Sequence, residues 1–262
     1  MMAAAMDSTR AQSDGKPVNV LMLGTGDAFA SGGRSHSGYL IDAGAARVLM
    51  EAGPDVLGSL KRERIAPESI DLVLISHLHG DHFAGLAFLM LEYAYESRRR
   101  TTLVIAGPRH LESRTRAVVH AMYPGFPWQR VESKLRWVVL EPGRTARLRG
   151  VRVDAIRSPH TAPDISLSLR VSAAGKTIVF TGDTAWNEQL LPFSEGADLF
   201  LSECSFFDGG RGLKHLRYTE LAAQRRRFKV GRVVLTHLGR EVLEREGELA
   251  IETACDGMRI EL

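Results

Sequence analysis

Three histidines and one aspartate lie within six residues of the chain, and both residue types can bind a metal. His77, His79, Asp81 and His82 form the pattern H-x-H-x-D-H directly after the apolar run LVLI. Buried ring nitrogens need partners, so three imidazoles at the end of a buried strand are costly unless they bind something. The mixture of nitrogen and oxygen ligands favours a divalent transition metal, with zinc first and manganese or iron as alternatives.

Three further apolar runs of strand length also lead into a turn that carries a possible ligand. VRVDAI leads to His160, TIVF leads to Asp183, and RVVL leads to His237. Rigid strands often hold catalytic groups in the loops at their ends. If the four strand ends converge, they supply seven ligands, which are too many for one tetrahedral zinc ion. We therefore expect two metal ions that share a bridging carboxylate.

The order and approximate spacing of these motifs resemble the metallo-β-lactamase superfamily. The segment LGTGDA at positions 23–28 is similar to the first strand and turn of its ribonuclease Z-like branch. The resemblance covers most of the chain and implies a role for each ligand. His77, His79 and His160 would hold the first metal, Asp81, His82 and His237 would hold the second, and Asp183 would bridge the two.

The resemblance also implies a fold of the α/β (α+β) class, a four-layer αββα sandwich in which helices cover two facing sheets. Strands and helices recur in both halves of the chain, which is compatible with this architecture. A length of 262 residues and an ordinary composition suit one large domain. We expect residues 1–16, which are small and polar, to be a disordered tail, and residues 17–262 to form a single domain.

Apolar patterns and turn residues predict the elements that would position these groups. Helices are expected at 54–64, 83–97 (amphipathic), 108–121, 186–193 and 218–228, and near the C-terminus. Strands are expected at 18–23, 38–42, 47–50, 71–75, 103–106, 165–171, 177–180, 199–203 and 233–235, with two or three more in 138–156 and an edge strand at 257–262.

Composition argues against several classes of protein. No apolar stretch reaches the roughly 18 residues of a membrane span, and residues 1–16 lack the pattern of a secretory signal. The two cysteines, Cys204 and Cys255, have no paired spacing, so we expect a cytoplasmic protein and not a secreted zinc β-lactamase. Phe29 stands where the last glycine of G-x-G-x-x-G would be, which excludes a dinucleotide loop. A net charge of +3 is not by itself the mark of a nucleic-acid-binding protein.

Glu203 and His215 are candidates for catalysis beside the ligands. Glu203 ends an apolar run and is similar to a glutamate of ribonuclease Z-like enzymes. His215 is similar to a histidine that precedes a helix in these enzymes, although their His-x-Thr is stretched here to His215 and Thr219. A His–Glu pair can hold an imidazolium ready to protonate a leaving oxygen. We expect His215 to be a general acid or a substrate contact, with a surface histidine as the alternative.

Hydrolysis is the expected reaction. Two metals can lower the pKa of a bridging water towards neutrality, and the resulting hydroxide would attack while Asp81 and Asp183 orient it. The chain has no G-x-S-x-G motif that would indicate a side-chain nucleophile. An ester, lactone or thioester hydrolase is an alternative, as is a non-hydrolytic protein of the same fold that acts in cofactor biosynthesis or binding.

The interval between His160 and Asp183 bears on the size of the substrate. Its 22 residues leave room for two strands and a turn, whereas the usual bacterial ribonuclease Z carries a long tRNA-gripping arm there. A small phosphodiester is therefore favoured as substrate. Neither tRNA nor a membrane is expected as a partner, and a homodimer is an open alternative.

Overall fold

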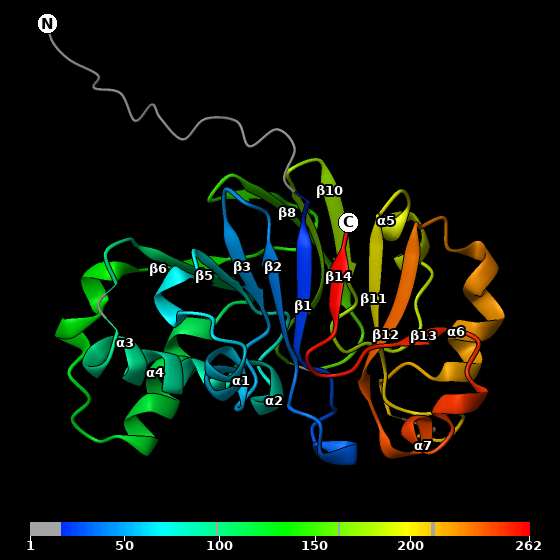
Figure 1. The fold of residues 1–262 in the computed structure, drawn as a ribbon, viewed down its shortest axis with the longest axis horizontal. Coiled ribbons are helices and arrows are strands. Elements are labelled where there is room, and N and C mark those ends of the chain that lie inside the picture. Colours follow the sequence, from blue (N-terminus) through cyan, green and yellow to red (C-terminus); the bar gives the residue numbers. More distant parts are fainter. Residues whose placement is uncertain (1–16, 98, 162, 211–212) are drawn as a thin grey trace, which may run out of the picture.

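Two sheets of seven strands each form the centre of the molecule (Figure 1). The computed structural model describes residues 17–97, 99–161, 163–210 and 213–262, so the predicted tail at 1–16 lies outside the described residues. The first sheet has the strand order β14 (Arg259–Glu261), β1 (Asn19–Gly24), β2 (Gly38–Asp42), β3 (Arg47–Met50), β4 (Leu72–Leu74), β5 (Leu103–Gly107) and β6 (Leu135–Val139). The second sheet has the order β13 (Glu252–Thr253), β12 (Arg232–Leu238), β11 (Leu199–Cys204), β10 (Lys176–Phe180), β9 (Ser166–Ala173), β8 (Val151–Ser158) and β7 (Thr145–Leu148).

Helices cover the outer face of each sheet (Figure 1). Those of the first sheet are α1 (Val56–Arg62), α2 (Gly80–Phe83), α3 (Gly85–Tyr95) and α4 (Leu111–Met122). Those of the second sheet are α5 (Leu190–Ser194), α6 (Tyr218–Gln224) and α7 (Arg240–Leu243). One apolar cluster fills the space between the sheets, and one more lies under each helical layer. The predicted four-layer αββα sandwich is confirmed. In the described part of the chain, no helix is both long enough and apolar enough to cross a bilayer.

Burial along the strands shows which of them are covered on both faces. In β8 the apolar Val151, Val153 and Ala155 are buried, while Arg152 and Arg157 are exposed. This alternation is typical of a strand with one face against a core and one in water. By contrast, every residue of β4 and β11 is buried, because sheet and helices enclose these strands from both sides. The central strands therefore give the residues at their ends a rigid support.

The ends of the ligand-bearing strands meet at one edge of the sandwich. β10, β11 and β12 are parallel, and β8 runs in the same direction because it and β10 both pair antiparallel with β9. The loop after β4 joins this edge from the other sheet, since the Leu167 amide donates to the Ser76 carbonyl at 3.0 Å. Gly182 lies at the same junction with φ +57°, and an added Cβ would lie 2.5 Å from the Leu167 oxygen. Only glycine fits at such a position.

Several predicted boundaries were wrong. The helix expected at 83–97 is preceded by α2 from Gly80, so Asp81 and His82 lie in a helical turn. Most residues of α3 are buried, because α1 and α4 lie beside it. The helix is therefore not amphipathic, contrary to the prediction. α4 begins at Leu111 and not at 108, because His110 adopts the left-handed conformation with φ 75°. The C-terminal edge strand is confirmed as β14, antiparallel to β1, whereas β13 was not predicted.

Gly85 fixes the two helices of the H-x-H-x-D-H segment against the loop that follows β3. Its amide donates to the Ala52 carbonyl at 2.9 Å. A Cβ at this position would lie 2.1 Å from the Gly53 oxygen and 2.7 Å from the Ala52 oxygen. Both neighbours are backbone atoms, so they cannot move aside by a change of rotamer.

We expect Gly85→Ala to lower the free energy of unfolding by about 3 kcal/mol, the upper end of the usual cost of overpacking. Urea unfolding of the metal-free protein measures this change without a contribution from bound ions. The matched control is Gly58→Ala in α1, where the added Cβ meets only the flexible end of Arg62 at 3.4 Å. This control should gain about 0.5–1 kcal/mol. Equal stabilities of the two variants would contradict the close approach.

Candidate metal centre

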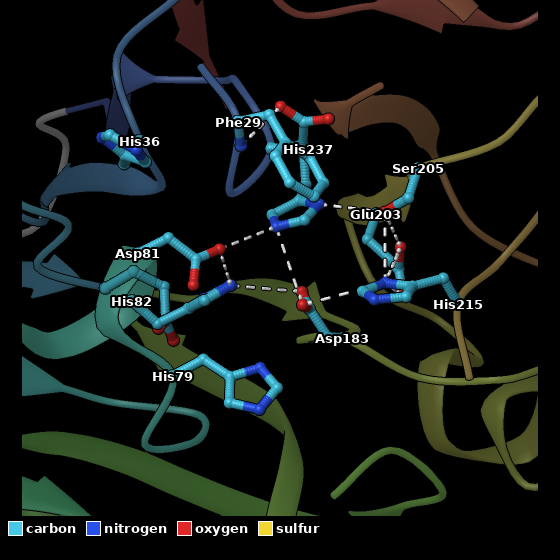
Figure 2. A network of polar contacts seen from close by, with 12 residues as sticks. Phe29, His36, His79, Asp81, His82, Asp183, Glu203, Ser205, His215 and His237 are labelled. Atoms are coloured by element: carbon cyan, nitrogen blue, oxygen red, sulfur yellow. Dashed lines mark hydrogen bonds and ion pairs between the residues drawn. The ribbon is translucent and has the colours of Figure 1, made fainter. Parts of the chain in front are cut away.

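All seven predicted ligands converge at the edge where the strands end. Figure 2 labels five of them, His79, Asp81, His82, Asp183 and His237. One group with ligand atoms within 4.8 Å of one another comprises His77, His79, His160 and Asp183. A second group at the same spacing comprises Asp81, His82, Asp183 and His237. Asp183 belongs to both groups, which is the arrangement that a shared carboxylate requires.

His237 reaches the centre because its strand is irregular at that point. In the pairing of β11 with β12, Glu203 lies opposite Thr236 and Cys204 lies opposite Leu238, so His237 is the extra residue of a bulge. Its φ is +51°, a strained value for a residue other than glycine. Bulges re-aim side chains next to active sites, and this one directs His237 towards Asp81 and Asp183.

Four of the histidines have a fixed orientation because Nδ1 has a partner. Nδ1 of His160 donates to the Lys214 carbonyl at 2.8 Å, and Nδ1 of His77 lies 3.0 Å from the Ser76 hydroxyl. Nδ1 of His82 lies 3.0 Å from Glu51 Oε2, and Nδ1 of His237 lies 3.0 Å from Ser205 Oγ. Each of these rings therefore presents Nε2 to the centre, as metal-binding histidines usually do. His79 presents Nδ1 instead, 3.1 Å from Nε2 of His160.

The residues fit a bound divalent metal. Among the described residues, Nε2 of His77, Nε2 of His82 and Oδ1 of Asp183 are buried and have no hydrogen-bond partner. Nε2 of His82 lies 3.2 Å from Asp81 Oδ2 and 3.3 Å from Asp183 Oδ1. Two atoms bound tetrahedrally to one zinc ion are about 3.4 Å apart. Unpaired buried donors and acceptors are costly, and metal ions at this centre would satisfy them.

The histidines of the centre fall into two groups, those whose pKa is lowered and those whose pKa is raised. Burial lowers the pKa of His77 well below its ordinary value, and burial also lowers the pKa of His79 and His160. Burial opposes the charge of His237 too, but Asp183 and Asp81 outweigh it and raise its pKa to about 9. In the metal-free chain, the group around Asp81 and His237 therefore holds protons that a metal must displace.

Asp183 is an anion in spite of its burial. Burial alone would raise the pKa of its carboxyl, but the charges of His237 and His82 hold that pKa well below the usual range. The same holds for Asp81, whose pKa is lowered chiefly by His82 and His237 against the effect of burial. Both carboxylates are thus ready to bind cations at neutral pH.

Glu203 and His215 lie together, as their resemblance to ribonuclease Z-like enzymes predicted. Nδ1 of His215 lies 3.1 Å from both carboxylate oxygens of Glu203 (Figure 2). Burial lowers the pKa of His215, but the contact with Glu203 outweighs it and the net pKa is raised. The charged imidazolium is therefore favoured.

Two buried residues in contact with the ligands were missed by the sequence analysis. Glu51 accepts a hydrogen bond from the Ser76 amide at 2.8 Å and also contacts His82. It follows the apolar strand β3, so the search for ligand-type residues after strands would have found it had glutamate been included. Ser205 donates to Glu203 Oε2 at 2.6 Å and lies 3.1 Å from His215, and no sequence pattern indicated this serine.

A cavity of about 990 Å³ opens onto this centre. Its floor is polar and includes His79, Asp81, Asp183 and His237. His215 lies in the wall of the same cavity. A small molecule in the cavity can therefore contact the metal ligands and the His215–Glu203 pair at once.

This fold and this cluster define a protein of the metallo-β-lactamase fold superfamily, in its ribonuclease Z-like branch. The chain belongs to the family of the anti-Pycsar protein Apyc1, whose family model matches residues 18–253.

Similar proteins of known structure or curated description agree with this assignment. The probable metallo-hydrolase YhfI of Bacillus subtilis is 25% identical over 226 residues, which span 84% of this chain and 87% of that protein. Its crystal structure has a TM-score of 0.75 and covers 94% of this chain and 99% of that one. Ribonuclease Z of Methanosarcina acetivorans is 23% identical over 272 residues, spanning 84% of this chain and 87% of that protein. The short form of human tRNase Z has a TM-score of 0.71 at 21% identity and covers 92% and 98% of the two chains.

We expect the apparent affinity for zinc to rise between pH 6 and pH 9, because protons and metal compete for the same nitrogen atoms. Below the raised pKa of His237, about 9, binding must displace a proton, and this cost disappears as the pH rises through that value. The expected slope is about tenfold in affinity per pH unit for each displaced proton. Competition with a chelator of known affinity at several pH values measures the slope. An affinity that is flat after correction for the chelator would show that the centre holds no such protons.

Proposed function

We propose that this protein is a hydrolase that depends on two divalent metal ions and cleaves small phosphodiesters. The observation that supports it best is that Asp183 belongs to both of the four-residue groups formed by the predicted ligands. A third group joins Asp183 and His237 to Glu203 and His215. We assign His77, His79 and His160 to the first ion and Asp81, His82 and His237 to the second, with Asp183 shared. Zinc is the favoured ion, because the set combines imidazole and carboxylate ligands.

The chemistry can be divided between the metal ions and the chain. Two such ions, when bound, lower the pKa of a water molecule and withdraw charge from a phosphoryl oxygen. Asp81 and Asp183 supply the negative charge that holds the ions in place. Glu51 and Ser205 keep His82 and His237 turned towards the centre through their contacts with Nδ1.

His215 serves as the proton donor in this proposal. Glu203 occupies Nδ1, so Nε2 is the atom that gives its proton to the leaving oxygen. Burial lowers the pKa of His215, but the contact with Glu203 raises it on balance and so favours the protonated ring. Proton donation matters most for leaving groups that are poor, because these cannot depart as anions.

Two observations favour a small phosphodiester. The relatives called ribonuclease Z are named for cleavage of RNA, which is a chain of phosphodiesters. Between His160 and Asp183, the described residues form the strands β9 and β10 and a tight turn, with no extended arm in the part of this interval that the structure describes. A substrate that fits within the cavity of about 990 Å³ needs no such arm.

A turnover panel with the zinc-loaded protein tests the proposal. Bis(p-nitrophenyl) phosphate should be hydrolysed, and a set of lactones and thioesters should react much more slowly. Preferential turnover of lactones or thioesters would contradict the assignment to phosphodiesters, although the protein would still be a hydrolase. Maturation of a precursor tRNA at a higher kcat/KM than small diesters would overturn the assignment to small substrates.

Asp183→Ala should abolish turnover and weaken the binding of both ions, because the shared carboxylate contacts each of them. Elemental analysis should find close to two equivalents of metal in the parent protein and fewer than one in the variant. Asp183→Asn is the matched control for size, since it keeps the shape of the side chain and removes its charge. Retention of two equivalents in both variants would show that Asp183 is not shared.

His215→Ala should lower kcat by about 10²–10⁴-fold, the usual contribution of a general acid. The loss should be smaller for p-nitrophenyl esters than for alkyl esters, because p-nitrophenolate departs without a proton. Metal content should be unchanged. The exposed histidine His110, which lines a different cavity, offers the control, and His110→Ala should behave as the parent. An equal loss for both kinds of leaving group would assign His215 to substrate binding.

A further inference from the structure

Phe29 is an exposed aromatic side chain in the wall of the metal cavity. It is 87% exposed, which is the highest value for a large apolar side chain among the described residues. A single exposed phenylalanine is by itself ordinary. Phe29, however, lines the same cavity as His79, Asp81 and His237 (Figure 2). Its ring is therefore available to a molecule bound at the centre.

The backbone around Phe29 is held rigidly. One carboxylate oxygen of Asp27 accepts hydrogen bonds from the Phe29 amide at 3.1 Å and from the Ser31 amide at 3.0 Å. The other oxygen accepts the Ser31 hydroxyl at 3.0 Å. Ala30 completes the turn in the left-handed conformation with φ 51°. A side chain on such a fixed turn loses little backbone freedom when it binds a ligand.

The same loop is tied to the strand that carries His237. The Leu238 amide donates to the Thr25 carbonyl at 3.0 Å, and Gly26 forms a bridge with Leu238. The short helical turn at 31–33 also packs on α7, which follows β12. The position of Phe29 is therefore fixed relative to the metal ligands, which a specificity element needs.

Part of the cavity wall is apolar, unlike the floor. Ala28 and Ala30 flank Phe29 in the chain, and Phe206 and Leu213 line the same cavity, where Leu213 is 56% exposed. The charged residues Arg240 and Glu241 also line it. A polar floor beside an apolar wall suits a ligand with one charged group and one flat apolar group. Exposed aromatic rings bind such groups by stacking, and this works for planar rings of many kinds.

We propose that Phe29 is a specificity-determining residue that stacks on an aromatic ring of the substrate, and specifically on the ring that stays attached to phosphorus. This inference rests on the proposed function and adds the class of substrate, phosphodiesters that carry an aromatic group on the retained side. We choose the retained side because the two residues come from different segments. His215, which would protonate the leaving oxygen, is held by β11 through Glu203, whereas Phe29 comes from the loop after β1 and lies near His237 (Figure 2).

Two substrates with the same leaving group test the assignment. Bis(p-nitrophenyl) phosphate and methyl p-nitrophenyl phosphate both release p-nitrophenolate and differ only in the retained group. Phe29→Ala should raise KM for the first about 5-fold to 100-fold, the range that loss of one stacked ring corresponds to, and should change kcat much less. KM for the methyl ester should be nearly unchanged. Phe29→Tyr should restore KM, since tyrosine keeps the ring.

A binding measurement gives a second readout that does not depend on turnover. The phosphorus–carbon bond of phenylphosphonate and methylphosphonate is not hydrolysed, and the zinc-loaded parent should bind the phenyl compound more tightly. Phe29→Ala should remove this preference and keep the affinity for methylphosphonate. The control is Tyr95→Ala, because Tyr95 is an aromatic residue of α3 that is 56% exposed and lines a different cavity.

The outcomes separate this inference from the proposed function. If phosphodiesters are cleaved and Phe29→Ala behaves as the parent in both measurements, the stacking role is wrong and the function stands. An equal rise in KM for both substrates would place the ring on the leaving group and overturn the assignment to the retained side. If no phosphodiester is cleaved but the preference for phenylphosphonate disappears in Phe29→Ala, the stacking role stands and the function fails.

Discussion

The burial of one carboxylate, that of Asp183, is the constraint on which the centre depends. A carboxylate without water is costly unless opposite charges and polar groups surround it. Here the ring nitrogens of His77, His160 and His237 lie 3.6–3.7 Å from its Oδ2, and that of His82 lies 3.3 Å from its Oδ1. These histidines come from the loops after β4 and β8, from α2 and from β12. The carboxylate can only be accommodated when both sheets are in place, so folding and formation of the centre are linked.

Holding so many groups around one carboxylate requires backbone that is locally unfavourable. His237 and Glu51 both have positive φ angles, +51° and +63°, and neither is glycine. Such residues persist when the surrounding structure determines them, and they often lie at functional sites. Glu51 is fully buried and its pKa is raised, first by burial, while its contacts with Ser76 and His82 lower it. The strain of both residues serves the same end, which is the orientation of His82 and His237.

The cavity joins two kinds of surface that come from different parts of the chain. Its polar floor comes from the ends of strands of both sheets and from the loops that follow them. Its apolar wall comes from the loop after β1 and from the segment that precedes α6. Because loops tolerate change better than the strands that support them, a different wall would allow the same chemistry to serve other substrates. The wall, in which Phe29 is the most exposed ring, would determine which substrates this protein prefers.

Much of the architecture was predictable because its signals are local. Alternating or continuous apolar runs indicate strands, and the residues directly after them, such as His77, His160 and Asp183, are found by position alone. The same reasoning placed the hairpin of β2 with β3 and the edge strand β14. Boundaries were less predictable where a single conformation decides them, as at His110, whose left-handed φ delays the start of α4.

The candidate ligands and the order of the elements that carry them can be predicted from the sequence, because both depend on neighbours within a few residues. How these groups meet depends on contacts between segments that lie far apart in the chain. Glu51 follows an apolar strand, which is a local signal, but the histidine that it contacts is 31 positions away. Ser205 contacts a histidine 32 positions away and follows no local pattern. The bulge at His237 likewise arises from the pairing of β12 with β11, and the exposure of Phe29 depends on a turn tied to that same strand. Such features come from contacts between distant segments, so they form only when the chain folds.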